Sequence, residues 1–199
     1  MTDTLQSIGS IDPASNKKVE RSDDPVEAEY EDGKRFYENE EYGQAAVALH
    51  NALIGYEERK DESGIANVCN QLGNVCLARK EYENALKHYQ RALDICDGSY
   101  DRMSVLAVSK PLVAVYRGLG QSAKAIATCL DMVDLYQDNR DPQGTVTVLE
   151  EMASIYIDSG EKEKAADSYR TIAAIHKNFS HNNIAASFIE KADTLLSDS

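Results

Sequence analysis

The chain matches itself, without a gap, when it is shifted by forty residues. Residues of similar kind recur at this spacing in five columns: Ala45, Ala85, Ala125 and Ala165; Phe36, Cys76, Tyr116 and Tyr156; Gly33, Gly73, Val113 and Ala153; Leu49, Tyr89, Cys129 and Tyr169; Leu53, Leu93, Val133 and Ala173. A fixed period of this length indicates stacked repeats, each of which needs its neighbours to bury its apolar side. We therefore place four repeats at 26–65, 66–105, 106–145 and 146–185.

Within each repeat the apolar residues follow helical spacing, and the alternation of a strand is absent. In the second copy this spacing joins Ile65, Val68, Cys69, Leu72, Val75 and Cys76, and it resumes after the short segment "ARKE". Segments between repeats, such as "KDESG" and "DNRDPQG", are longer and richer in helix breakers. We expect two helices per repeat, joined by a tight turn, and longer turns between repeats.

Small residues recur where two such helices must approach each other. Gly73 on the first helix and Ala85 on the second are predicted to mark the closest contact, with Tyr82 and Tyr89 filling the wider gaps beside it. A single pair of helices cannot bury both of its faces, so the pairs must stack into a solenoid.

The second copy resembles the tetratricopeptide repeat, on the series Leu72, Gly73, Tyr82, Ala85, Tyr89 and Ala92. Its length and the run Leu72-Gly73-Asn74 are similar to the long repeats of kinesin light chains and spindle-orientation adaptors. The resemblance covers residues 26–185 and implies an all-α, right-handed solenoid of four helix-turn-helix repeats. The third and fourth copies depart from the pattern: Val113 replaces the glycine, Met132 and Ile172 replace an alanine, and Ser122 and Lys162 replace a tyrosine.

The two ends of the chain differ from the repeats. Residues 182–196 keep the register, but Asp193 stands where Ala153 stands one repeat earlier, so we predict a capping helix that closes a domain spanning 26–199. Residues 1–25 hold few large apolar side chains and are predicted to form a disordered tail.

Charge and composition limit the partners. The net charge of −13 disfavours nucleic acid and anionic membranes, which bind basic surfaces. The sequence contains no run of 18 apolar residues, so no membrane-spanning helix is predicted. The first residues lack the apolar segment of a secretory signal. We therefore expect a cytoplasmic protein.

No sequence motif supports catalysis, a metal or a cofactor. The four cysteines, at 69, 76, 96 and 129, form no CxxC pair, and we expect them to be small buried apolar residues. The four histidines lack metal-ligand spacing. "GLGQSA" at 118–123 resembles a dinucleotide-binding loop, but predicted helices flank it, so we interpret it as a turn.

By the same resemblance, the first helix of each pair lines the concave face. The predicted groove residues are Tyr30, Lys34, Tyr37, Asn67, Asn70, Asn74, Lys110, Arg117, Glu150 and Ser154. Amides both donate and accept hydrogen bonds, so the three asparagines are predicted to pair with the main chain of an extended peptide. Lys34, Lys110 and Arg117 add positive charge that favours acidic side chains in the ligand. The alternative is that these residues form a solvated face or bond within their own repeat.

We predict a non-enzymatic scaffold that binds a protein or peptide partner in this groove. The alternative is a self-assembling structural protein, a homo-oligomer built through end-to-end or convex-face contacts. One local irregularity is expected, because Pro111 cannot donate a backbone hydrogen bond inside a helix. We predict a kink or a late helix start near Ser109.

Overall fold

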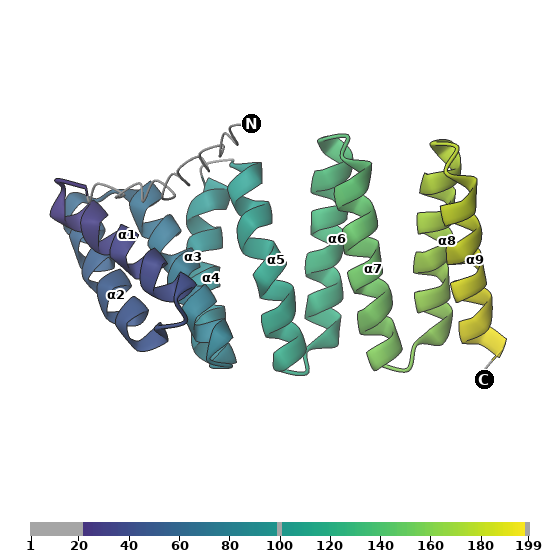
Figure 1. Cartoon of the computed structure of the whole chain (residues 1–199), viewed down its shortest axis with the longest axis horizontal. Helices are drawn as coiled ribbons and strands as arrows, with labels where there is room; N and C mark the ends of the chain where they lie inside the picture. The colour runs from purple at the N-terminus through teal and green to yellow at the C-terminus, as the bar shows by residue number, and fades with distance from the viewer. Residues whose placement is uncertain (1–21, 99–100, 198–199) are drawn as a thin grey trace, which may run out of the picture.

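The computed structural model describes residues 22–98 and 101–197, and this part of the chain is built of helices without a strand. The helices are α1 (Pro25–Glu38), α2 (Tyr42–Arg59), α3 (Glu62–Ala78), α4 (Tyr82–Gly98), α5 (Arg102–Gly118), α6 (Ser122–Asp138), α7 (Pro142–Asp158), α8 (Lys162–Asn178) and α9 (Asn182–Ser197). They follow one another side by side in chain order (Figure 1). The predicted tail at 1–25 lies almost wholly outside the described residues.

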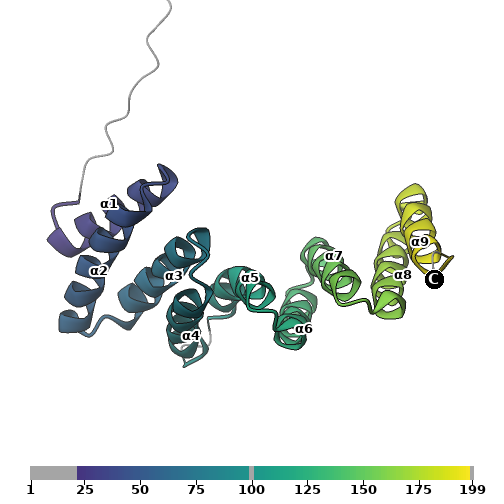
Figure 2. The same cartoon turned by 90° about the horizontal axis from the view of Figure 1, so that it is seen from below.

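The predicted fold class is confirmed. Four antiparallel pairs, α1/α2, α3/α4, α5/α6 and α7/α8, stack into an all-α right-handed solenoid, and α9 packs on α8 as the last helix. The first helices of the pairs lie along one side of the array and the second helices along the other (Figure 2). Both ends of the array bend toward the side of the first helices, so α1, α3, α5, α7 and α9 line its concave face.

The described turns share one design. Each turn contains one residue with positive φ: Glu40, Lys60, Lys80, Gly120, Arg140, Gly160 and Ser180. In the first turn, Glu41 N–H donates to the carbonyl of Phe36 at 2.8 Å and Glu40 N–H to that of Tyr37 at 2.9 Å. Such paired bonds satisfy the last carbonyls of a helix and end it.

The prediction of longer turns between repeats is wrong. Helix α2 ends at Arg59 and α3 begins at Glu62, a gap no longer than the one between α1 and α2. The side chain of Asp61 caps α3 by accepting the N–H of Gly64 at 3.0 Å. Gly64 therefore lies in the first helical turn, where a Cβ would come within 2.3 Å of the Tyr56 ring. Pro142 likewise occupies the start of α7, where a helix tolerates proline.

The predicted late start of α5 near Ser109 is also wrong. The helix begins at Arg102 and continues through Pro111 to Gly118. Asp101 caps it by accepting the N–H of Ser104 at 3.1 Å. Pro111 leaves the carbonyl of Ala107 without its usual donor. Ala107 is exposed on the concave face, where water can bind that carbonyl, so the helix does not have to break.

In the first three pairs, two buried residues that face each other across the helix contact differ in size, so that a small residue on one helix stands opposite a larger one on the other. A Cβ on Gly33 would lie 2.6 Å from Leu49 Cγ, and a Cβ on Gly73 would lie 2.6 Å from Tyr89 Cε1. The predicted tight approach at Gly73 is confirmed, but its predicted partner is wrong: the ring of Tyr89, and not Ala85, packs directly on Gly73. The third pair reverses the sizes, with Val113 on α5 and the smaller Cys129 on α6.

Candidate functional site

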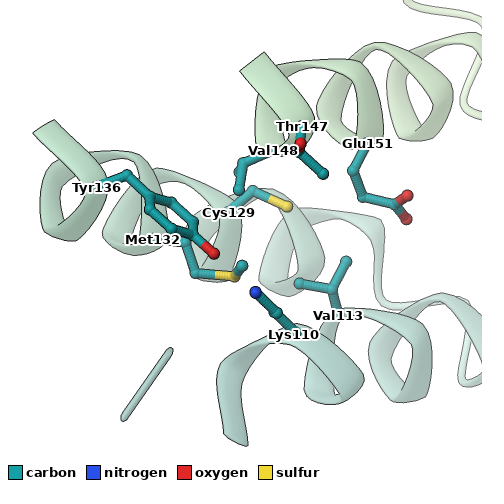
Figure 3. A pocket seen from close by; sticks show the side chains of 8 residues that line it. All are labelled: Lys110, Val113, Cys129, Met132, Tyr136, Thr147, Val148 and Glu151. Atoms are coloured by element: carbon teal, nitrogen blue, oxygen red, sulfur yellow. The ribbon is translucent and has the colours of Figure 1, made fainter. Parts of the chain in front are cut away.

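The concave face has a pocket between α5 and α7, and residues of α6 form its base. The pocket has a volume of about 280 Å³ and is lined by Lys110, Val113, Cys129, Met132, Tyr136, Thr147, Val148 and Glu151. Lys110 and Thr147 are exposed on first helices, so the pocket opens on the concave face. Helix α3 packs directly against α5 along this face, whereas α5 and α7 approach each other less closely. Figure 3 shows the Lys110 amine and the two sulfur atoms pointing into the space between the helices.

The pocket has an apolar floor. Val113 and Val148 are 3% exposed, Met132 is 4% exposed and Cys129 is 1% exposed. Burial raises the pKa of the Cys129 thiol to about 12, and the nearby Glu151 charge adds to the rise. The thiol is therefore neutral near pH 7, and a neutral thiol is a poor nucleophile and a poor metal ligand.

One cation and one carboxylate stand at the rim. Lys110 Nζ lies 5.6 Å from the centre of the Tyr136 ring, and no described carboxylate pairs with it. Glu151 is already engaged, because its Oε1 accepts a hydrogen bond from Arg117 Nη1 at 2.6 Å. The uncompensated charge at the pocket is thus the positive charge of Lys110.

Arg117 joins α5 to α7. Its guanidinium also donates to Ser154 Oγ at 3.2 Å and to Asp158 Oδ2 at 2.5 Å. The hydrogen bond to Glu151 is the main cause that raises the Arg117 pKa. The sequence predicted that Arg117 would offer positive charge to an acidic ligand. In the structure, two carboxylates of the chain itself already balance that charge. Of the predicted basic residues, Lys110 is the one at the pocket.

The three predicted asparagines have different environments. Asn67 is exposed on α3. Asn70 Oδ1 is buried, and no donor among the described residues reaches it. Asn74 bonds within its own pair: Oδ1 accepts from the Tyr89 hydroxyl at 2.7 Å, and Nδ2 donates to Gln71 Oε1 at 3.2 Å. The alternative of internal bonding therefore applies to Asn74.

The predicted residues on α1 pack against neighbouring aromatic rings, two of which belong to α2. The half-buried Tyr30 ring meets the Tyr56 ring edge-on, with centroids 6.5 Å apart. Burial raises the pKa of Tyr30. Lys34 Nζ lies 5.4 Å from the centre of the same Tyr30 ring. The ring of Tyr37 lies 5.9 Å from that of Tyr42. On α7, Glu150 is exposed and Ser154 is bound by Arg117, so the predicted residues do not form one cluster.

Sequence reasoning missed the floor of the pocket. Its signal was nevertheless present in the columns, since Gly73, Asn74 and Tyr89 are replaced together by Val113, Ala114 and Cys129 one repeat later. A cysteine in a column of larger side chains predicts unfilled space unless a neighbour grows to fill it. Met132 in the place of Ala92 fills only part of it.

Three further features of the described residues bear on the expectations from sequence. Within residues 22–98 and 101–197, no three His, Cys, Asp or Glu side chains are grouped as metal ligands would be. The helices of this same part are too short or too polar to cross a bilayer. "GLGQSA" forms the turn between α5 and α6, centred on Gly120 with φ +68°.

Comparison with known proteins identifies the repeat type. Residues 66–98 match the family model of the tetratricopeptide repeat, which confirms the predicted resemblance in the second copy. No curated protein sequence matches the chain.

Several solved structures share the fold. The apo form of RapI is 13% identical with a TM-score of 0.67, over 88% of this chain and 54% of that one. The Rap conjugation gene regulator of plasmid pLS20, in complex with the Phr* peptide, is 13% identical with a TM-score of 0.61, over 87% and 53%. BtubC from P. vanneervenii is 12% identical with a TM-score of 0.60, over 83% and 77%. The chain spans about half the length of the two Rap proteins, and the likeness is one of fold.

Proposed function

We propose that the chain is a non-enzymatic interaction module that binds an extended segment of a partner protein along its concave face. The observation that carries this proposal is the pocket between α5 and α7, which opens on that face. Pockets of this kind, mostly apolar with few polar groups at the rim, are typical of binding sites.

The chemistry of the pocket supports binding over catalysis. Its one thiol is neutral, its one carboxylate is paired with Arg117, and its lysine has no acid beside it to exchange a proton. The Rap regulator in complex with the Phr* peptide shows that a similar fold can hold a peptide. The proposed partner is therefore a peptide or protein segment, and the chain acts as an adaptor or scaffold.

We place the module in the cytoplasm. All four cysteines lie in the described part of the chain, and no disulfide joins them, as is usual for proteins of a reducing compartment. Quantifying thiols in protein isolated under acid quench tests this. Four reactive thiols after unfolding are expected, and fewer would contradict the proposal.

Site-specific photocrosslinking tests which face binds. A benzophenone side chain is placed singly at Asn67, Ala107 and Thr147, which are exposed on α3, α5 and α7. Matched controls carry it at Val47 and Leu130, which are 63% and 50% exposed on α2 and α6. We expect one partner band from source-cell extract at the concave positions and none at the controls. A band at the control positions alone would move the site to the convex face.

Self-association is the second candidate function. It is favoured by Ile184 and Ile189, which are 45% and 43% exposed on the last helix. Sedimentation velocity over a hundredfold concentration range decides between the two. A constant monomer sedimentation coefficient supports the interaction module, and a concentration-dependent rise that Ile189→Lys abolishes supports self-assembly.

A further inference from the structure

The pocket exists because one repeat has lost a filling side chain. In the α3/α4 pair, Tyr89 is 0% exposed, its ring packs on Gly73, and its hydroxyl is held by Asn74. In the α5/α6 pair the corresponding positions are Val113, Ala114 and Cys129. The phenol, the glycine that makes room for it and the amide that binds its hydroxyl are all replaced. The space that a tyrosine ring fills in one pair is open in the next.

The space suits one aromatic side chain. A cavity of about 150 Å³ lined by apolar side chains is large enough for benzene. The pocket has a volume of about 280 Å³ and a floor of Val113, Val148, Cys129 and Met132. Sulfur atoms make favourable contacts with aromatic rings, which gives the floor a preference for a ring over an aliphatic side chain.

The rim adds a preference for negative charge. Lys110 Nζ points into the pocket, and among the described residues no carboxylate pairs with it. Glu151, on the opposite wall, is neutralised by Arg117 at 2.6 Å. Among the residues that line the pocket, the one cation, Lys110, has no ion pair, whereas the one anion, Glu151, is paired with Arg117.

We propose that the α5–α7 pocket binds an aromatic side chain of a partner peptide, with an adjacent Asp or Glu carboxylate held by Lys110. The inference deepens the proposed function and rests on it, since it names the part of the concave face that selects the ligand. Specificity then comes from the third pair, whereas the second pair, filled by Tyr89, presents a closed surface.

Three capped heptapeptides serve as probes. The first has the sequence Gly-Gly-Asp-Phe-Asp-Gly-Gly, the second replaces Phe with Ala, and the third replaces both Asp with Lys. Binding is followed in the full chain through ¹³C-labelled methionine methyl groups. Met132 lines the pocket, and Met103, 67% exposed on the same solenoid, is the internal control. A ring bound in the pocket shifts the Met132 methyl upfield and leaves Met103 unchanged.

We expect saturable binding of the acidic Phe peptide, and at least about tenfold weaker binding of the other two peptides. The variant Val113→Gly/Ala114→Asn/Cys129→Tyr transplants the filling of the second pair and is expected to abolish binding. Lys110→Glu is expected to weaken it about tenfold. Lys124→Glu is the matched control, because Lys124 has the same cation–ring distance of 5.6 Å, to Tyr116, outside the pocket. It is expected to leave affinity unchanged.

Several outcomes would overturn the inference. They are an unshifted Met132 methyl in the wild-type protein, equal binding of the Ala peptide, or equal effects of the two lysine variants. If the triple variant fails to fold, the wild-type Met132 shift and the lysine pair still decide the matter. A concave-face crosslink together with an unshifted Met132 rejects the pocket and retains the proposed function. Crosslinks on the convex face alone reject the proposed function itself.

Discussion

The pairs α3/α4 and α5/α6 have the same helix lengths and register but different interiors. Each of the four helices has 17 residues, and each begins twenty residues after the one before it. In the first of these pairs Tyr89 is enclosed and hydrogen-bonded. In the second, Cys129 leaves a pocket of about 280 Å³ on the concave face.

The difference shows that a repeat can change its interior while its helices keep their lengths and their spacing along the chain. Each pair contacts only its neighbours, so stability is distributed over many interfaces. The apolar core is accordingly divided: α5 contributes Val108 and Leu112 to a cluster with α2–α4, and Leu106 and Val113 to a cluster with α6–α9. A cavity at Cys129 therefore weakens one cluster while the other stays closed.

The largest effect is expected when Gly73 of the α3/α4 pair is replaced by valine, the residue found at the corresponding position 113 of the α5/α6 pair. Gly73→Val forces a side chain against the Tyr89 ring, where even a Cβ would lie 2.6 Å away. We expect a loss of about 3 kcal/mol in the free energy of unfolding. Thermal and urea unfolding of the purified variant measure this loss.

Two variants control this prediction. Gly43→Val adds a side chain at a helical glycine whose Cβ would meet nothing within 4 Å, so stability should hold. Gly73→Val/Tyr89→Cys recreates the sizes of Val113 and Cys129, and its loss should be smaller than the sum of the single losses. Additive losses would show that the two positions are not matched in size.

A smaller effect is expected from removing the hydroxyl group that closes the second pair. Tyr89→Phe leaves Asn74 Oδ1 without the donor that it has at 2.7 Å. We expect a loss of about 1–2 kcal/mol. Tyr169→Phe is the matched control in the fourth pair, because the Tyr169 ring is half-buried against Phe188 at 5.9 Å and its hydroxyl has no hydrogen bond among the described residues. Equal losses in the two variants would contradict the role of Asn74.

The repeat architecture could be predicted from sequence because its cause is local. The alanine column at 45, 85, 125 and 165 is 0% exposed throughout, as a tight helix contact requires. Turn lengths were mispredicted because Gly64 and Pro142 are helix breakers in general but are accepted in a first helical turn.

The surroundings of the proposed binding residues could be predicted only in part. The spacing placed Lys110 correctly on an exposed concave position. It could not show that Arg117 would be bound by Glu151 and Asp158, which lie 34 and 41 residues further along the chain. Nor could helical spacing show that Asn74 bonds to Tyr89, because that bond depends on the direction of two side chains across a helix contact.

The smallest effect is expected from the bridge that joins α5 to α7 beside the pocket. Arg117→Ala removes the bonds to Glu151 and Asp158, and we expect a loss of about 0.5–1 kcal/mol that shrinks in about 1 M salt. Arg102→Ala is the control, since its pair with Asp138 is more exposed, at 57% against 32% for the Arg117 side chain. A loss that does not depend on salt would mean that the Arg117 stem, and not its charge, supports the third and fourth pairs.

The central claim, that the third pair is open where the second is closed, can be tested directly in crystals under xenon pressure. Xenon occupies apolar space that is large enough to hold it. We predict a xenon atom beside Cys129, Met132 and Val148 in the wild-type protein, none beside Tyr89, and none in either place in Val113→Gly/Ala114→Asn/Cys129→Tyr. Wild-type crystals without xenon at Cys129, or a triple variant that still binds it there, would contradict the account.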